Sequence, residues 1–163
     1  MSCLQPEAVE KHCGPNASGL KPRLYAALPS SVDAIPAATD GVVSTDITML
    51  NTDVFVEIAI SKYNGEMNAE PEGDVDGTEL PVRVSGMVVK MEGGKSASLN
   101  KLQGGEYIFI VIDRNGKKWI IGDKEEGGFI QIGLQTNDKN GYPFTIIWDS
   151  AMFCYEYTGV IPT

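Results

Sequence analysis

The sequence contains a single histidine, His12, which stands next to Cys13. A cysteine–histidine nucleophile requires an imidazole held rigidly beside the thiol. The surrounding segment, Met1 to Gly19, is polar and interrupted by prolines and glycines, so we expect a mobile arm. Adjacent residues in such an arm rarely form a catalytic site. We therefore predict no catalytic residues and no enzymatic activity.

Positive charge is also scarce. Thirteen lysines and arginines stand against 22 acidic residues, which gives a formal net charge of -9 at pH 7. A nucleic-acid-binding surface needs clustered basic side chains to neutralise phosphates, and docking on an anionic membrane needs the same. The composition argues against both partners, but it is compatible with a protein past which DNA slides without binding.

Long apolar runs are missing as well. No run approaches the ~20 residues of a membrane helix, and Met1 to Gly19 lacks the apolar stretch of a secretion signal. We expect no membrane partner and folding in the cytoplasm of the cell that makes the protein. The three cysteines, Cys3, Cys13 and Cys154, are an odd number without a secretion signal. That combination favours free thiols over a disulfide framework.

Two short motifs resemble ligand sites but lack essential parts. Asp74 and Asp76 begin a calcium-loop pattern, yet neither the third ligand nor the distal glutamate of an EF-hand is in place. The segment 93–96 resembles the end of a phosphate-binding loop, yet the first glycine of that motif would be Val89. No cysteine or histidine pair has the spacing of a structural zinc site. We therefore expect no metal and no cofactor, and we interpret the acidic segment as a solvated loop.

The residues that are abundant point to short strands and frequent turns. The chain of 163 residues is 42% hydrophobic and contains 18 glycines and 9 prolines. This length fits one domain. We expect a mainly β fold in which residues 1–19 form an N-terminal arm and residues 20–163 form a single β domain.

The β-rich runs predict a β-sandwich or barrel of about eight or nine strands with one short flanking helix. Pro22 indicates an edge strand or the start of a strand, and Gly86 indicates a bend or bulge in its strand. The run 54–60 is apolar on both faces, which is typical of a central strand. The runs are residues 20–28, 47–50, 54–60, 81–91, 107–112, 117–122, 129–135, 143–148 and 152–158.

Turn and helix signals in the sequence predict how the strands are connected. Asn115 and Gly116 lie between two β-rich runs, which is the strongest short-range hairpin signal. The segment 137–141 predicts a second hairpin. For the helix, Ser96 is the expected N-cap, and Gly104 is the expected end. Leu99 and Leu102 lie on one helix face and are expected to dock it across one end of the sheet structure.

The aromatic residues in the predicted strands allow two interpretations. Core and cross-strand packing is the simpler one, and a platform on which a glycan stacks is the alternative. Phe153, Tyr155 and Tyr157 share one face of the last run, whereas Cys154 faces the other and is expected to be a small buried residue. The remaining aromatic residues of this set are Phe109, Trp119 and Trp148.

The order of these elements resembles that of the tail tube (major tail) proteins of long-tailed phages, of the kind found in phages and prophages of Bacteroides-type bacteria. Three segments carry the resemblance. They are residues 13–25, the block 99–122 that joins the helix to the first hairpin, and the ending 155–159.

The resemblance implies a virion protein that is made in the bacterial host cytoplasm. Six copies would form a ring in which strands of neighbours close an inner β-barrel. Rings would stack through Met1 to Gly19 and Glu66 to Thr78 and would contact other tail proteins. Strands that are apolar on both faces gain burial in such a ring, and ring closure removes exposed strand edges. An acidic lumen would let DNA pass without specific binding.

Two alternatives stay open at this point. Another virion component, such as a head-decoration or tail-terminator subunit, shares the class but not the stacked ring. A monomeric ligand- or glycan-binding β-barrel would instead contain a pocket lined by aromatics with a few polar groups. A tube subunit should need Met1 to Gly19 to polymerise, whereas a monomeric binder should tolerate the loss of this arm.

Overall fold

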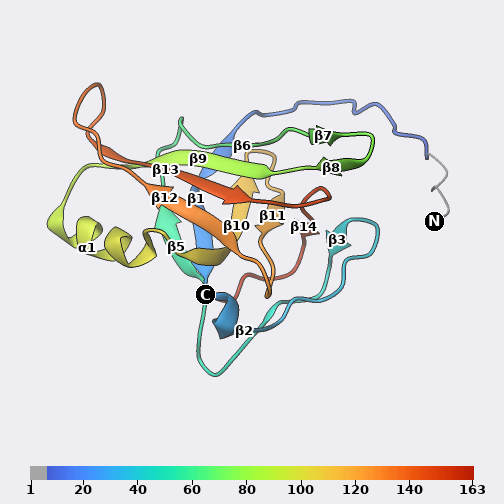
Figure 1. Cartoon of the computed structure of the whole chain (residues 1–163), viewed down its shortest axis with the longest axis horizontal. Coiled ribbons are helices and arrows are strands. Elements are labelled where there is room, and N and C mark those ends of the chain that lie inside the picture. The colour runs from blue at the N-terminus through green and yellow to red at the C-terminus, as the bar shows by residue number, and fades with distance from the viewer. Residues whose placement is uncertain (1–6) are drawn as a thin grey trace.

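The structure, a computed structural model, describes residues 7–163 and consists mainly of β-strands (Figure 1). One α-helix, α1 (Gly93–Leu102), and one 3-10 helix (Pro29–Ser31) accompany the strands within this range. The strands are β1 (Leu20–Ala27), β2 (Val32–Ala34), β3 (Val42–Val43), β4 (Thr48–Met49), β5 (Val56–Ala59), β6 (Glu66–Ala69), β7 (Glu72–Asp74), β8 (Gly77–Glu79), β9 (Val82–Val89), β10 (Glu106–Asp113), β11 (Lys118–Ile121), β12 (Gly128–Ile132), β13 (Gly141–Trp148) and β14 (Glu156–Tyr157).

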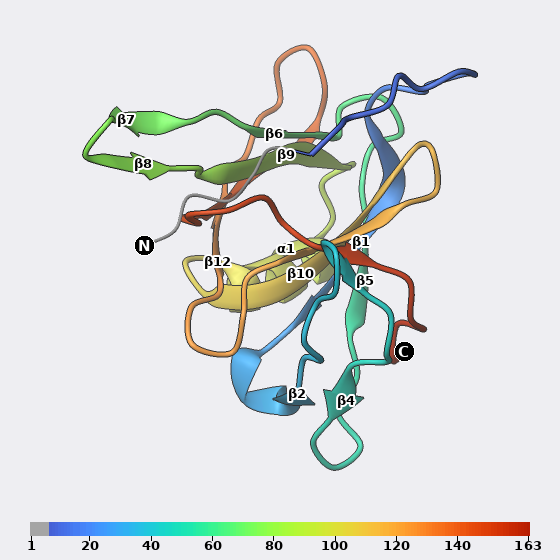
Figure 2. The same cartoon turned by 90° about the vertical axis from the view of Figure 1, so that its right-hand side faces the viewer.

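The predicted fold class is confirmed: the fold is mainly β, with one flanking helix. Ten strands form one large sheet, whose main path runs β3-β14-β11-β10-β12-β13-β9-β6. Strand β10 is the branch point, since it also pairs with β1, and β1 in turn pairs with β5. The sheet folds over on itself, so that β6 and β9 lie above β1, β5 and β10 in Figure 2. The strands beyond the eight or nine predicted are short ones of two to four residues.

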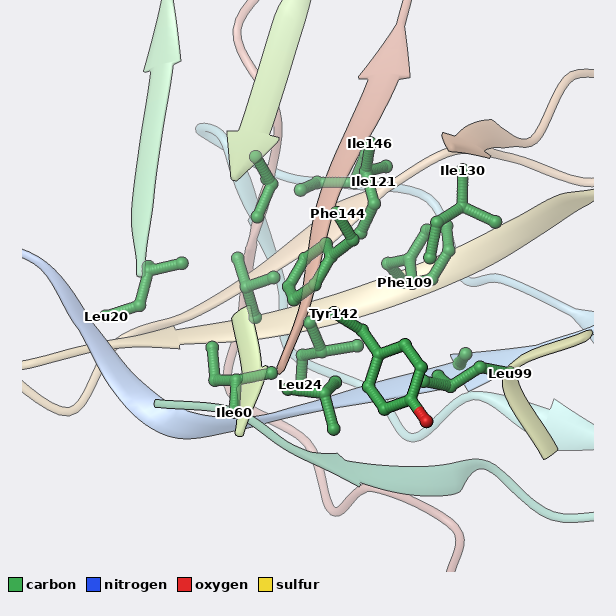
Figure 3. Packing of buried hydrophobic residues seen from close by; sticks show 14 of the residues in the cluster. Leu20, Leu24, Ile60, Leu99, Phe109, Ile121, Ile130, Tyr142, Phe144 and Ile146 are labelled. Atoms are coloured by element: carbon green, nitrogen blue, oxygen red, sulfur yellow. The ribbon is translucent and has the colours of Figure 1, made fainter. Parts of the chain in front are cut away.

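The main core fills the space between the two layers. Figure 3 shows side chains of β1, β10, β12 and β13 converging there, with Leu99 of α1 at the margin. Each such aliphatic or aromatic side chain contributes about 1.5–3 kcal/mol when it is removed from water. The sheet therefore derives its stability from packing the two layers together rather than from any single strand pair.

A second core lies on the opposite face of β1 and β10. Along β10, Phe109 and Val111 point into the main core, whereas Ile108 and Ile110 point into the second. Strand side chains alternate between faces, so a strand buried on both sides must be apolar throughout. This requirement explains the uninterrupted apolar run of β10. The loops between β1 and β5 and the C-terminal segment cover the second core, with Val32, Val43, Ile47, Phe55 and Tyr157 at its centre.

Both predicted hairpins are present. Strands β10 and β11 pair antiparallel, as do β12 and β13. In the first turn only Gly116 has a positive φ, at 88°, so the turn does not place both Asn115 and Gly116 in that region as expected. The turn is closed by the Gly116 amide, which donates to the Asp113 carbonyl at 3.0 Å.

Three strand positions differ from the predictions. Strand β1 has partners on both sides, so it is not an edge, and Pro22 lies where its register shifts. Strand β5, predicted to be central, pairs with β1 alone among the described residues. The last predicted strand shrinks to Glu156–Tyr157. Gly86 also forms no bend, because β9 stays in continuous register with β13.

The helix differs from the expected pattern only at its start. Glu92 is the N-cap residue, and Ser96 lies inside the helix with its hydroxyl against that of Tyr142, so the predicted cap is wrong. Leu99 is buried and Leu102 packs against the main core, as predicted. Gly104 follows the C-cap with a φ of 71°, which only glycine adopts without strain and which ends the helix.

Within residues 7–163, no helix is long and apolar enough to cross a membrane. Residues 70–79 of the acidic segment, for which a loop was predicted, are all exposed, but they contain an antiparallel ribbon made of β7 and β8.

Candidate assembly surfaces

The first candidate surface is the free edge of β5. Its four residues pair with β1 on one side, and no strand within the described chain pairs with the other side. Val54 and Val56 point to the same face of this strand and are 46% and 63% exposed. Unpaired backbone groups next to exposed valines form a template for adding a strand from another chain.

An apolar groove runs beside this edge. Its apolar lining includes Ala26 of β1, Val54, Val56 and Ile58, and Leu102 of α1. The groove has a volume of about 820 Å³. Residues of β1, β5 and α1 all contribute to this lining, so the groove lies between the helix and the β1–β5 strand pair. We call this feature the α1–β5 groove.

Four charged residues line the α1–β5 groove: Lys95 and Lys101 of α1, and the acidic Asp53 and Glu57. The ammonium group of Lys95 donates to the carbonyl of Val89 at 2.9 Å and lies 3.7 Å from the carboxylate of Glu92. A hydrogen bond from Lys90 holds the pKa of the Glu92 carboxyl below its usual value. The segment 90–102 contains three lysines and one glutamate, so it is positively charged in a chain whose net charge is negative.

This arrangement does not form a phosphate site from the segment 93–96. A phosphate-binding loop leads from a strand into a helix within a parallel βαβ unit, whereas α1 follows β9, which pairs antiparallel. The carboxylate of Glu92 stands at the helix start, where it opposes a second anion, and Lys95 is engaged by it. The resemblance to that motif is therefore confined to the sequence.

The second candidate surface is the β7–β8 ribbon. Five acidic residues and no basic residue lie in the segment 70–79. The Asp76 amide donates to the carboxylate of Asp74 at 2.9 Å, which closes the turn. Gly73, with a φ of 114°, lies so near the Gly77 carbonyl that a Cβ would approach it to 2.1 Å. Glycine is therefore required where the two strands meet, and Val75 at the tip is left fully exposed.

The acidic side chains of the ribbon do not gather around one point. Among residues 7–163, no group of three or more histidine, cysteine or acidic side chains is arranged to hold a metal ion. The Asp74 carboxylate is used in the turn, and the other acidic side chains of the ribbon are solvent-exposed. This exposure agrees with the prediction that the acidic segment is solvated.

The third candidate surface is the N-terminal arm, of which residues 7–18 are described and exposed. It contacts the β10–β11 turn, where the Ala17 amide donates to Asn115 at 2.9 Å and the Asn115 amide group donates to Asn16 at 2.8 Å. In Figure 1 the arm and the β7–β8 ribbon extend toward the same end of the molecule. Residues 1–6, including Cys3, lie outside the described part of the chain.

The residues considered for chemistry are dispersed. His12 and Cys13 are both exposed in the arm, and the Cys13 thiol contacts the Lys11 carbonyl at 4.0 Å. Cys154 is half-buried, and burial raises the pKa of its thiol. A raised pKa favours the protonated form of the thiol. The residue is half-buried and not fully buried as expected.

The aromatic residues divide between core and surface instead of sharing one platform. Phe109 and Tyr157 are fully buried, and Trp119 packs against the main core while its indole donates to Asp113 at 3.0 Å. Phe153 and Tyr155 are exposed, so they do not share the environment of Tyr157 as predicted. The Tyr157 hydroxyl, whose pKa is raised by burial, holds two chain segments together.

Sequence reasoning missed the β5 edge and the α1–β5 groove. The alternation of Val54, Val56 and Ile58 was a signal that one face of this run is apolar. What covers that face depends on the position of α1, which is set by contacts far away in the sequence.

No protein-family model, no curated protein and no solved structure matches this chain.

Proposed function

We propose that this chain is a structural subunit that assembles with copies of itself into rings, and that it serves as a tail tube subunit of a phage virion. In this proposal six copies form a ring, rings stack into a tube, and DNA passes through the lumen without specific binding. Other tail proteins would meet the tube at its ends. The sequence resemblance supports the tube in this proposal. The surfaces described above support the assembly of copies with one another.

The observation that carries the proposal is the free edge of β5. A free edge flanked by exposed Val54 and Val56 is an aggregation hazard in a monomer. Natural proteins protect such edges with charges, prolines, bulges or a covering segment, and β5 carries only Glu57 as a charge. A neighbouring subunit that pairs with β5 would satisfy the free backbone groups and cover the valines.

Two further features support self-assembly over a binding or catalytic role. The arm and the β7–β8 ribbon project from the body and bury little surface within their own chain. Projecting segments of this kind reach neighbouring subunits. The net charge of -9 also suits a lumen that repels DNA phosphates.

The α1–β5 groove favours one alternative, a monomeric protein that binds an apolar ligand. Its volume lies within the ~300–1,000 Å³ of ordinary ligand sites. Its lining is mainly aliphatic, and Tyr107 is the one aromatic residue that contributes to it within the described chain. This lining argues against glycan stacking. A head-decoration or tail-terminator subunit is the alternative within the same class, and it would form a ring that does not stack.

The test is a matched pair of substitutions at exposed valines. Val56→Lys places a charge on the free edge of β5, while Val160→Lys places one at a site that is 70% exposed and outside this strand. We expect Val56→Lys to abolish assembly and Val160→Lys to assemble like the parent, both with unchanged thermal stability. Sedimentation velocity measures the assemblies. Equal assembly of the two variants would overturn pairing at β5.

A further inference from the structure

We propose that Asn115 is a site of spontaneous deamidation to isoaspartate, and that this modification releases the N-terminal arm from the β10–β11 turn. Asn115 stands directly before Gly116 in the turn of the hairpin, and both residues are exposed. Asparagine is among the chemically labile residues of proteins, and a glycine after it leaves the attacking backbone nitrogen unshielded by a side chain. The reaction takes place within one chain, so it is independent of the proposed assembly.

The reaction consumes water and needs no enzyme or cofactor. The Gly116 amide nitrogen loses its proton and attacks Cγ of Asn115, so that an N–Cγ bond forms, the Cγ–Nδ2 bond breaks and ammonia leaves. Water then opens the succinimide ring at one of its carbonyl groups. Opening at one carbonyl gives aspartate, and opening at the other gives isoaspartate, in which the main chain runs through the former side-chain carbon. In both cases an amide and a water become a carboxylic acid and ammonia, without oxidation or reduction.

The chain contains three Asn-Gly pairs, all of them within the described residues, and they differ in the room around the glycine. A Cβ added at Gly116 would meet nothing within 4 Å. At Gly65 it would stand 3.1 Å from the Cβ of Leu20, and at Gly141 it would stand 2.5 Å from the Val88 carbonyl. Gly65 and Gly141 are also buried. The succinimide ring therefore fits without displacing neighbours at Asn115, but not at the other two pairs.

The attacking nitrogen also becomes free more easily at Gly116 than at Gly141. The Gly116 amide donates one hydrogen bond, to the Asp113 carbonyl at 3.0 Å, in an exposed turn. The Gly141 amide belongs to a reciprocal backbone pair with Gln135, in which both hydrogen bonds measure 3.0 Å. Exposed turns open locally at a lower free energy than buried parts of a sheet. Reaction is therefore expected first at Asn115.

The side chain that would be modified is the clamp of the arm. Oδ1 of Asn115 accepts a hydrogen bond from the Ala17 amide at 2.9 Å, and its Nδ2 donates to Oδ1 of Asn16 at 2.8 Å. Aspartate would keep the acceptor for the Ala17 amide. Isoaspartate instead carries its carboxylate directly on Cα and adds one carbon to the main chain of the turn. The groups that hold the arm then lose their places opposite Asn16 and Ala17, so the arm is released.

The site is tested by ageing the full-length protein at mildly alkaline pH. Cleavage before aspartate residues places the three pairs in the separate peptides 53–73, 113–122 and 138–148. Mass spectrometry with electron-based fragmentation then distinguishes asparagine, aspartate and isoaspartate at each position. We expect Asn115 to deamidate about tenfold faster than Asn64 and Asn140, because local opening limits the reaction at the two buried glycines. Reaction at Asn115 that is no faster than at the other two would refute the site.

The same protein aged in denaturant is the matched control. Unfolding removes the differences in packing, so the three asparagines should then react at similar rates. A preference for Asn115 that persists unchanged in denaturant would come from the neighbouring residues in the sequence, and it would overturn the structural explanation.

Release of the arm is measured by hydrogen exchange at the Ala17 amide. We expect this amide to exchange about tenfold faster in the isoaspartate-rich fraction, separated by charge, than in fresh protein. Asn115→Ala removes the clamp without any reaction and should match that fraction, whereas Asn115→Asp keeps the acceptor and should match fresh protein. The amide of the buried Ile110 is the reference for an intact fold and should exchange equally in all forms. Exchange at Ala17 that is the same in fresh and isoaspartate-rich protein would overturn the release of the arm.

Discussion

The ring of Phe144 lies directly over Gly86 on the neighbouring strand. The two residues are paired across β9 and β13, and a Cβ at Gly86 would approach the Phe144 ring to 2.8 Å. Phe144 is 5% exposed and packed within the main core, so a shift of its ring would disturb other buried side chains. The glycine of β9 is therefore a packing requirement and not a bend.

We expect Gly86→Ala to destabilise the protein by about 1–3 kcal/mol, which is typical of overpacking in a filled core. Gly93→Ala is the control, because a Cβ at Gly93 meets no atom within 4 Å and its φ lies outside the positive range. Chemical denaturation of both variants measures the free energy of unfolding. An unchanged value for Gly86→Ala would show that the Phe144 ring is not fixed over the glycine.

The Tyr157 hydroxyl offers a second stability test. It accepts a hydrogen bond from the Ile47 amide at 3.0 Å and donates to the Val160 carbonyl at 2.6 Å. Tyr157→Phe leaves the buried Ile47 amide without a partner, which should lower the free energy of unfolding by about 1–3 kcal/mol. Tyr155→Phe, at a residue that is 36% exposed, should change it little. Equal effects in the two variants would remove the assigned role of the Tyr157 hydroxyl.

Thiol reactivity should separate Cys154 from Cys13. Burial raises the pKa of the Cys154 thiol, so at a given pH a smaller fraction is present as the reactive thiolate. Cys13 is exposed in the arm. We expect iodoacetamide to modify Cys13 first at pH 8, and the rate at Cys154 to rise as the pH increases toward its thiol pKa. Peptide mapping by mass spectrometry follows both sites, and faster modification of Cys154 would contradict the assignment.

Deletion of residues 1–18 should prevent stacking while leaving the fold intact. In the described part of this segment, side-chain hydrogen bonds to the β domain end on Asn115, so its removal costs little stability. Asn115→Ala is the control, because it releases the arm from the β10–β11 turn without removing it. The deletion should have an unchanged melting temperature and should form no tubes. Tubes that form normally without the arm would exclude it from the assembly contacts.

The elements that could be predicted from the sequence are those set by local signals. The β10–β11 and β12–β13 hairpins follow from short turns between β-rich runs, and Gly104 marks the end of α1. The apolar run of β10 indicated burial, and the structure shows that two separate cores produce it.

The features that sequence reasoning missed depend on pairing between distant segments. Whether β1 or β5 lies at an edge is decided by contacts with β10, which is more than 45 residues further along the chain. Ser96 has the residue type of an N-cap, but the chain enters the helix earlier, at Glu92. To predict the α1–β5 groove, one would have to know both that β5 is an edge strand and that α1 lies beside it.

Negative-stain microscopy of the full-length protein over a concentration series, with the mass measured by light scattering, tests self-assembly most directly. We expect hexameric rings that stack into tubes as concentration rises, and a mass that increases from the 17.6 kDa of one chain toward multiples of six. Particles that remain at 17.6 kDa at every concentration, with no rings on the grid, would contradict the proposal.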